Sequence, residues 1–462
     1  MLSQAMIEDV LAAALETGGD FADVFVEDKT STSISMIGGG VDAALTGRDY
    51  GIGIRVISGL FAVYAYSNDL RRENLIKIAR SAAQAIRGTQ RDLTLDLRTV
   101  SLNHAHPIQI VPASVTKAKK IELMRRAHLA AKSYDPLISQ TSISYKDEDQ
   151  KVLIANSDGL FIEDRRIRTR LYVEAVATLG REKQVGTSSP GAHQGFEFLE
   201  NLDIEKHARI AAHTAKTMVG AEFAPSGKIP VIIDNEFGGV IFHEACGHGL
   251  EATSVAKKVS VFSDRVGELV ASPLVTAIDD GTIQNAWGSS TIDDEGTPTQ
   301  RNVLIENGVL KGYLIDKLGG KRMGMESTGS ARRESYKFAP TSRMNNTYIA
   351  AGTSTPEEII ANTEYALYAK YLGGGSVNTA TGDFNFVVRE GYIVKNGKIE
   401  KPVRGATLIG KGIDVLQKID MVGNNLGFGQ GMCGSISGSI PADVGQPMIR
   451  VSEITVGGRK GD

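Results

Sequence analysis

The chain has 462 residues, of which 42% are apolar and 23% charged, and its formal net charge is −3. This length predicts at least two domains, and the composition is typical of a globular protein. A run of roughly 18 apolar residues, which a membrane-spanning helix requires, does not occur in the sequence, so we do not expect a membrane protein.

The first predicted element is an amphipathic helix over residues 6–15. Met6, Val10 and Leu11 fall on one face at helical spacing, and two glycines at residues 18 and 19 end the segment. No cationic segment precedes the apolar residues, so the start is not typical of a secretory signal peptide. We therefore expect a cytoplasmic protein.

Strand-like segments follow, and the order helix, strands, helix occurs twice before residue 220. FADVFVEDK, TSISMIGG, GIGIRVI and LFAVYAY predict the first strands, with a hairpin turn at Ser58-Gly59 and a helix near residues 75–86. A connector at residues 88–112 leads to a helix over residues 113–132, further strands and a helix over residues 203–218, and the letters TSIS occur in both halves. We therefore predict an internal duplication that forms an antiparallel sheet covered by helices.

The densest basic run lies in the second group of strands. In DRRIRTRLY, a period of two places Arg166, Arg168 and Arg170 on one side of a strand and Arg165 on the other. Aromatic residues do not interleave with these cations, and the sequence shows no second basic cluster. We therefore interpret the run as a solvated strand face and expect no nucleic-acid partner.

The stretch GAEFAPSGK, residues 220–228, predicts the boundary between a first domain at residues 1–220 and a second at residues 221–462. Beyond it, short apolar runs such as NVLIENGVLKGYLI surround Asn-Gly turns, which predicts a strand-rich, barrel-like domain. PEEIIANTEYALYAKY is an exception and predicts a helix. The expected fold class is α+β, with a helix-covered antiparallel sheet followed by the barrel-like domain.

The stretch DNEFGGVIFHEACGHGLEA brings His243, Glu244, Cys246 and His248 close together in the sequence. Histidine and cysteine are common zinc ligands, but an i, i+5 spacing leaves two imidazoles about 140° apart on an ideal helix. They share a metal ion only if the helix is wound loosely or breaks around Gly247. The segment therefore predicts a distorted helix that carries a metal site.

A catalytic zinc ion takes three protein ligands and keeps one position for water, so the two histidines need a third donor. Cys433 is the favoured candidate, because the glycines of NNLGFGQGMCGSISGSIP let the backbone fold tightly around a thiolate. Cys246, the other cysteine of the chain, diverges from the imidazoles on a helix, and an Asp or Glu ligand stays open.

Four segments resemble the TldD/PmbA metalloproteases, and specifically the metal-bearing TldD branch. They are HEACGHGLEA, TIDDEGTPTQRNVLIENGVLKGYL, GSARRESYKFAPTSRMNNTYI and GQGMCGSISGSIP, in this order across the second domain. The resemblance implies that His243, His248 and Cys433 bind Zn²⁺ and that Glu244 is the catalytic base. One departure is Cys246, where the family pattern has a small apolar residue.

The resemblance further implies a dimer, either with a TldE/PmbA-like partner that lacks the metal motif or between two copies of this chain. It implies substrates that are small or unfolded peptides, bound by strand addition beside the metal. In this mechanism zinc lowers the pKa of its bound water to about 7, and Glu244 takes the water proton and returns it to the leaving amine.

Two other functions compete with a peptidase. A non-catalytic peptide-binding or regulatory subunit with a structural zinc requires a fourth protein ligand. A redox protein requires a disulfide between Cys246 and Cys433 and no metal.

Several further residues have weaker signals. Arg332 and Arg333, or the backbone N–H groups of residues 373–375, are candidates for stabilising the oxyanion, although a structural role is favoured for the two arginines. The Asp293 region reads as a turn, with a substrate contact left open. His104 and His106 are expected to be solvent-exposed, and Trp287 is expected to pack.

Overall fold

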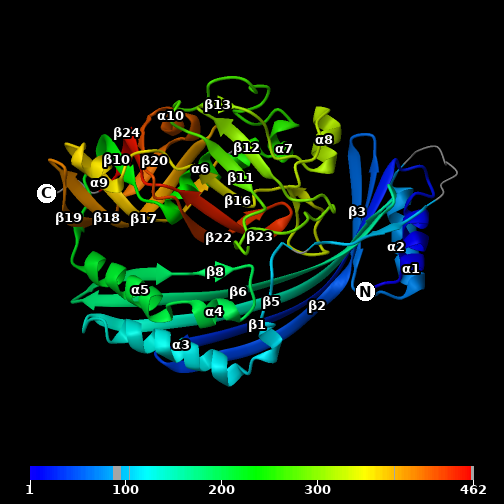
Figure 1. Ribbon diagram of the computed structural model, residues 1–462, viewed down its shortest axis with the longest axis horizontal. Helices are drawn as coiled ribbons and strands as arrows, with labels where there is room; N and C mark the ends of the chain where they lie inside the picture. Colours follow the sequence, from blue (N-terminus) through cyan, green and yellow to red (C-terminus); the bar gives the residue numbers. More distant parts are fainter. Residues whose placement is uncertain (87–94, 104, 379, 459–462) are drawn as a thin grey trace.

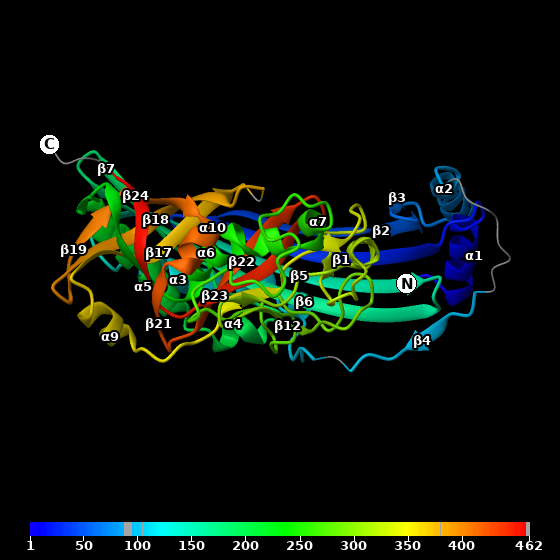
Figure 2. The same ribbon diagram turned by 90° about the horizontal axis from the view of Figure 1, so that it is seen from above.

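The computed structural model describes residues 1–86, 95–103, 105–378 and 380–458. The chain forms two layers, which Figure 1 shows one above the other. The N-terminal layer is a long curved sheet with its helices, and the C-terminal layer is rich in short strands. Figure 2 shows that α1 (Gln4–Ala14) and α2 (Arg72–Gln84) lie at one end of the molecule, whereas β19 (Lys398–Arg404) and β24 (Ile449–Gly457) lie toward the other.

The N-terminal layer is built on one sheet with the strand order β3-β2-β1-β5-β6-β4, and β7 and β8 also pair with β6. Its pairings are antiparallel except for the parallel pair β4–β6. The strands are β1 (Phe21–Ile37), β2 (Gly40–Ser58), β3 (Phe61–Ser67), β4 (Arg98–Val100), β5 (Ile138–Asn156), β6 (Leu160–Leu179), β7 (Glu182–Ser188) and β8 (Gly191–Ala192). The remaining helices are the 3₁₀ turn η1 (Pro112–Ser114), α3 (Lys117–Lys132), α4 (Glu197–Asn201) and α5 (Ile204–Val219).

Alternation along β1 explains how this sheet is covered on both faces. Val24 and Val26 pack with α1 and α2, and Ile34 packs with α3 and α5. The intervening Phe25 and Glu27 face the C-terminal layer, where the Glu27 carboxylate accepts the backbone N–H of Tyr336 at 3.0 Å. Successive side chains of a strand point to opposite faces, so the helices cover one face and the C-terminal layer covers the other.

The predicted repeat is present in the order of the elements. A helix, two long strands, a short strand and a helix occur as α1-β1-β2-β3-α2 and again as α3-β5-β6-β7-α5, apart from the short β8 and α4. The letters TSIS lie in the second half of β1 but near the start of β5, and Ser35 pairs with Ser144 across the two strands. The order of the elements therefore supports the duplication, whereas the shared TSIS letters do not, because they lie at different places in the two repeats.

The interpretation of the arginine run as a solvated strand face is wrong. Arg166 and Arg168 are each 7% exposed and face the C-terminal layer. Arg166 pairs with Asp164 and, at 2.6 Å, with Asp294, while Arg168 donates to the carbonyls of Trp287 and Ser289. A period of two cannot tell a solvated face from one that a later part of the chain covers.

The C-terminal layer combines a barrel with a second sheet. The path β17-β10-β24-β20-β18 is closed by pairing of β17 with β18, and β19, β9 and β21 extend this sheet. Its strands are β9 (Glu222–Phe223), β10 (Gly227–Ile233), β17 (Tyr365–Val377), β18 (Asp383–Lys395), β19 (Lys398–Arg404), β20 (Thr407–Lys411), β21 (Ile419–Val422) and β24 (Ile449–Gly457). The α+β class and the barrel-like C-terminal part are thus confirmed.

The second sheet has the order β13-β12-β11-β16-β23-β22, which leaves β22 at an edge. Its strands are β11 (Ala277–Asp280), β12 (Arg301–Glu306), β13 (Val309–Leu310), β16 (Asn346–Ile349), β22 (Gly427–Ser435) and β23 (Gly438–Gln446), and a separate hairpin pairs β14 (Ala331–Arg332) with β15 (Thr341–Ser342). The helices are η2 (Glu236–Gly239), α6 (Val240–Ala245), η3 (Gly247–Leu250), α7 (Ala252–Val255), α8 (Lys317–Met323), α9 (Pro356–Ala361) and α10 (Gly412–Gln417). None of the described helices is both long enough and apolar enough to cross a bilayer.

The helix predicted for PEEIIANTEYALYAKY covers only the start of that stretch. A capping box between Thr355 and Glu358 begins α9, which ends at Ala361, and strand β17 begins at Tyr365. Residues 366–369 of β17 are all buried, and the strand pairs with β10 on one side and β18 on the other, so tertiary pairing overrides their helical tendency.

Candidate metal centre

The motif segment follows β10 and lies between the barrel and the second sheet. Helix α6 contacts β17 and β18 of the barrel and β16 and β23 of the second sheet. Its Ile241, Phe242 and Ala245 side chains belong to the main apolar core of this layer. That packing fixes the helix and therefore the direction of the His243 side chain.

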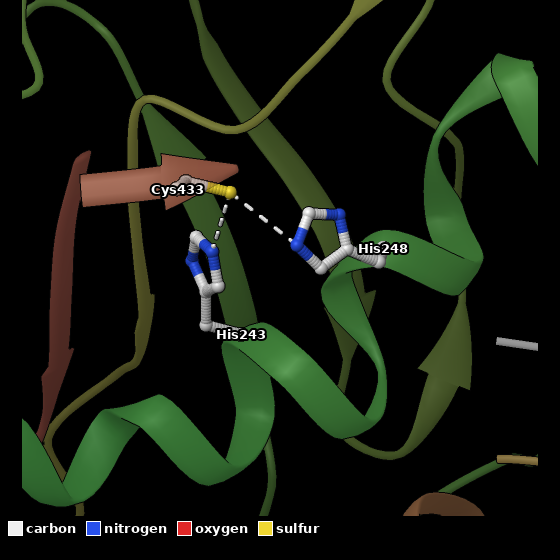
Figure 3. Close-up of side chains that lie close together, drawn as sticks. All are labelled: His243, His248 and Cys433. Carbon is white, nitrogen blue, oxygen red and sulfur yellow. Dashed lines mark hydrogen bonds between the residues drawn. The ribbon is translucent and has the colours of Figure 1, made fainter. Parts of the chain in front are cut away.

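The helix breaks one residue before the predicted point. It ends at Ala245, Cys246 adopts φ −130° and ψ −46°, and the tighter turn η3 begins at Gly247. The break brings the His243 and His248 rings together, with centroids 5.2 Å apart and planes at 85°. Figure 3 shows both rings directed toward the same sulfur atom.

That sulfur belongs to Cys433, which β22 supplies from far along the chain. Its Sγ lies 3.2 Å from His243 Nε2 and 3.3 Å from His248 Nε2. The three donor atoms lie within 4.8 Å of one another, and all three residues are buried. The structure therefore brings together the three residues named as ligands from the sequence.

The donor set fits a zinc ion. Tetrahedral zinc, with bonds of about 2.0–2.1 Å to nitrogen and 2.3 Å to sulfur, separates its N and S ligands by roughly 3.5 Å. The observed 3.2 and 3.3 Å are close to that spacing. A set of two imidazoles and one thiolate is also typical of zinc, so these residues can hold the ion that the motif implies.

Charge interactions favour the ligand form of the cysteine. Burial opposes it, but His243 and His248 hold the pKa of the Cys433 thiol well below its ordinary value. Burial likewise disfavours the His248 imidazolium, but the Glu251 carboxylate and Cys433 raise the pKa of His248 well above its ordinary value. The cluster thus stabilises a thiolate before any cation binds.

Glu251 and Arg343 were not found from the sequence. Glu251 Oε1 lies 3.1 Å from His248 Nδ1, so this carboxylate orients the ring and leaves Nε2 directed at the sulfur. Arg343, which is fully buried, donates to the Cys433 carbonyl and to Ser437 Oγ at 2.8 Å, and its Nε lies 4.0 Å from Glu251. The HGLE spacing was a usable signal for Glu251, because an i, i+3 pair meets on one turn; the sequence holds no comparable signal for Arg343.

Glu244 lies on the exposed side of the centre. Its side chain is 27% exposed, whereas that of His248 is 11% exposed, and its Oε2 lies 3.8 Å from His248 Nε2. A carboxylate beside the donors, with access to solvent, is in position to exchange a proton with a water molecule there.

The second cysteine does not join the cluster. Cys246 and Cys433 are both free thiols, and Cys246 is 1% exposed and packs in the apolar core. Burial raises the pKa of Cys246, which keeps the thiol protonated. The disulfide that a redox function requires is absent from the described structure.

The two arginines considered for the oxyanion are committed elsewhere. Arg332 donates to the Met344 carbonyl at 2.7 Å, and Arg333 donates to the Asp294 carbonyl at 3.0 Å, so both have the structural role that the sequence favoured. Asp293 is also structural, since its carboxylate accepts the N–H groups of Glu295 and Thr297 within its turn.

The expectation for the connector histidines is wrong for His106. Its ring is 5% exposed, accepts the Asn285 N–H at 3.0 Å and stacks on His193 with centroids 4.6 Å apart. The reason is that His106 lies between the layers, in contact with Asn285 of the C-terminal layer and His193 of the N-terminal layer. His104 lies outside the described residues, as do residues 87–94 of the same connector.

Two large clefts between the layers adjoin β22. One, of about 660 Å³, is lined by residues that include Asp234, Glu236 and Phe237. The other, of about 550 Å³, is lined in part by Trp287 and by residues 430–432, which immediately precede Cys433. Trp287 packs as expected, and its indole N–H donates to the Gly431 carbonyl at 2.8 Å.

Comparison with known proteins gives a consistent family. The models of the PmbA/TldA metallopeptidase domain 1, central domain and C-terminal domain match residues 22–86, 110–219 and 226–458. The chain is 38% identical to a metalloprotease TldD homolog of Haemophilus influenzae, over 95% of this chain and 93% of that protein. It is 33% identical to a metalloprotease of Methanothermobacter thermautotrophicus, over 96% of this chain and 97% of that protein.

Solved structures show the same fold. TldE from Thermococcus kodakarensis superposes with a TM-score of 0.78 at 19% identity, over 98% of this chain and 99% of that one. A suggested modulator of a DNA gyrase from Thermotoga maritima superposes with a TM-score of 0.80 at 22% identity, over 98% of this chain and all of that one.

Proposed function

Because the chain belongs to the PmbA/TldD metallopeptidase family, as its motifs predicted, we propose that it is a zinc-dependent peptidase that cleaves small or unfolded peptides. The observation that carries this proposal is the convergence of His243, His248 and Cys433 beside the partly exposed Glu244. When bound, a zinc ion would polarise the substrate carbonyl and lower the pKa of water to about 7.

The chain's own residues have distinct roles in this proposal. Glu244 takes a proton from the attacking water and returns it to the leaving amine. Glu251 fixes the orientation of His248, and Arg343 holds the backbone of Cys433, so the donors are preorganised. We assign stabilisation of the oxyanion to backbone N–H groups near residues 373–375. Gly373 and Gly374 of this segment line the cleft beside β22.

Substrate binding by strand addition is supported by the place of β22. This strand is the edge of the second sheet, and the 550 Å³ cleft runs beside it. An extended peptide that pairs with a sheet edge is held through its backbone, which suits broad sequence tolerance.

The non-catalytic alternative has less support. A structural zinc site is closed by four protein ligands, whereas the cluster found in the described part of the chain offers three. We also propose a cytoplasmic protein that acts as a dimer, with a second copy or with a TldE-like partner. Division into domains at residues 1–220 and 221–462 is supported by the apolar clusters, of which the two largest in the first part and the largest in the second share no residue across this boundary.

The test pairs zinc content with cleavage of an unstructured peptide. We expect Glu244→Gln to retain zinc and to lose turnover by roughly 10²–10⁴-fold, because a general base contributes about that much. Cys433→Ser should lose both zinc and turnover. The matched control is Glu268→Gln, an exposed carboxylate paired with Arg265, which should keep both. Full turnover by Glu244→Gln would contradict the mechanism.

A further inference from the structure

The 550 Å³ cleft is lined by cations from both layers. Lys146 of β5 and Arg168 and Arg170 of β6 come from the N-terminal sheet, and Arg389 comes from β18 of the barrel. Aromatic side chains, among them that of Tyr371, and residues 430–432 of β22 complete the lining. A ligand in this cleft therefore lies against β22 and beside several positive charges.

The Arg170 guanidinium has only neutral partners among the described residues. It donates to Ser189 Oγ at 3.1 Å and to the Gln430 carbonyl at 2.8 Å, and it lies 5.2 Å from the centre of the Trp287 ring. Burial lowers the pKa of Arg170, as expected for a cation that no close carboxylate compensates. Arg168, on the same strand and more deeply buried, donates to the backbone carbonyls of Trp287 and Ser289 and to no other group in the described part of the chain.

The Arg389 guanidinium has fewer hydrogen-bond partners than that of Arg170 among the described residues. Its nearest acceptor is Thr187 Oγ1 at 3.4 Å, and the described residues show no ion pair for it. The next residue, Glu390, points to the opposite face of β18, where it binds Lys370 and Tyr392. The Arg389 side chain is exposed toward the cleft, so its donors are available to a ligand.

The acidic residues near the cleft offset the charge of these cations only in part. Asp147 is already paired with Lys120 at 2.8 Å. Asp443 is the carboxyl group whose charge acts on Arg170. Burial raises the pKa of Asp443 to about 7, which makes it a weak counter-ion at neutral pH. Glu148 also lines the cleft and its charge acts on Arg168, so the lining holds two carboxylates, Asp147 and Glu148, against four cations. The cleft thus has an excess of positive charge.

Arg170 and Arg389 line the same cleft from different parts of the chain, and both charges act on one of its aromatic residues. Burial raises the pKa of Tyr371, which also lines the cleft, and the positive charges of Arg389 and Arg170 both oppose that rise.

We propose that this cleft binds a carboxylate group of an extended peptide, held between Arg170 and Arg389. The proposal rests on the proposed function for the identity of the occupant as a peptide. A guanidinium group donates two parallel hydrogen bonds to a carboxylate, and such charge-assisted bonds are among the strongest in proteins. The carboxylate belongs either to an Asp or Glu side chain or to the C-terminus of the peptide.

The experiment measures binding rather than cleavage, so that its failure differs from a failure of the proposed function. The zinc-loaded Glu244→Gln protein is titrated into fluorescein-labelled ten-residue peptides, and anisotropy gives the dissociation constant. One series replaces Gln by Glu at each position in turn, with an amidated C-terminus. A second arm compares the free acid with the amide of the all-Gln peptide.

We expect one Glu position, or the free acid, to bind roughly tenfold more tightly than its neutral counterpart, and the preference to weaken at high salt. Adding Arg389→Gln, an exposed position where misfolding is not expected, should reduce the preference to about twofold or less. Lys395→Gln, on the same strand but outside the cleft, is the matched control and should retain it.

Equal affinity for all peptides, or a preference that survives Arg389→Gln, would overturn the proposal. If the binding preference depends on Arg389 but the parent protein cleaves no peptide, the carboxylate site is supported and the proposed function is refuted. If the parent protein cleaves peptides but binds them without any preference for a carboxylate, the proposed function is supported and the carboxylate site is refuted.

Discussion

Replacing Glu251 should weaken metal binding without touching a ligand. The carboxylate lies 3.1 Å from His248 Nδ1 and 4.0 Å from Arg343 Nε, so it orients one ligand ring and faces the arginine that holds the other ligand strand. Partners of metal-bound histidines typically contribute 10- to 100-fold to metal affinity. At about 1.36 kcal/mol per factor of ten, that range corresponds to roughly 1.4–2.7 kcal/mol.

Two variants of Glu251 are expected to lie at the two ends of this 10- to 100-fold range. Glu251→Gln keeps an oxygen that accepts the His248 N–H but removes the charge, so we expect a loss of zinc affinity near tenfold. Glu251→Leu removes the acceptor as well and leaves a buried N–H unpaired, so we expect a loss near 100-fold.

Competition with a chromophoric zinc chelator measures both dissociation constants, and circular dichroism checks that each variant is folded. Glu306→Gln, an exposed carboxylate paired with Lys311, is the control and should bind zinc as the parent does. Folded Glu251→Leu protein with parental zinc affinity would refute the assigned role of Glu251.

Three further predictions concern residues away from the open side of the centre. Cys246→Ala should retain zinc and turnover, in contrast to Cys433→Ser, and should cost about 1 kcal/mol in the free energy of unfolding, because it removes only a small buried group; loss of zinc would make Cys246 a ligand. Asp443→Asn should flatten the pH dependence of the free energy of unfolding. Burial raises the pKa of this carboxyl group in the folded protein from 3.8 to about 7, so the folded state binds the proton more tightly than the unfolded state. The parent protein therefore loses stability as pH rises between these values, by up to about 1.4 kcal/mol per pH unit. Urea unfolding between pH 5 and pH 8 tests this, and identical slopes would contradict it. Asp294→Ala should lower the free energy of unfolding by roughly 3–5 kcal/mol, since it leaves the buried Arg166 without one of its two carboxylates; a change below 1 kcal/mol in chemical denaturation would show that the pair contributes little.

The sequence predicted the approach of His243, His248 and Cys433 to one another better than it predicted their surroundings. The i, i+5 spacing of His243 and His248 required a break in the helix, and the chain provides one at Cys246. Cys433 was favoured as the third donor because the chain holds two cysteines and Cys246, on the same helix as His243, was expected to point away from the imidazoles. These inferences depend on local geometry and ligand chemistry, which a sequence records directly.

Features that depend on contact between the two layers were not accessible in the same way. The period of β6 gave the correct side for Arg166 and Arg168, but only the covering layer shows that this side is buried. His106 was misjudged for the same reason. Arg343 lies 90 residues before the Cys433 carbonyl that it binds, and no spacing rule connects the two.

The long separation between the ligands also has a consequence for biosynthesis. His243 and Cys433 lie 190 residues apart, and the thiol is carried by one of the last strands of the chain. A nascent polypeptide that has not yet left the ribosome past β22 has both imidazoles but lacks the sulfur. Such an intermediate cannot bring all three donor atoms together, so the cluster forms only after β22 has been synthesised and has folded against α6 and η3.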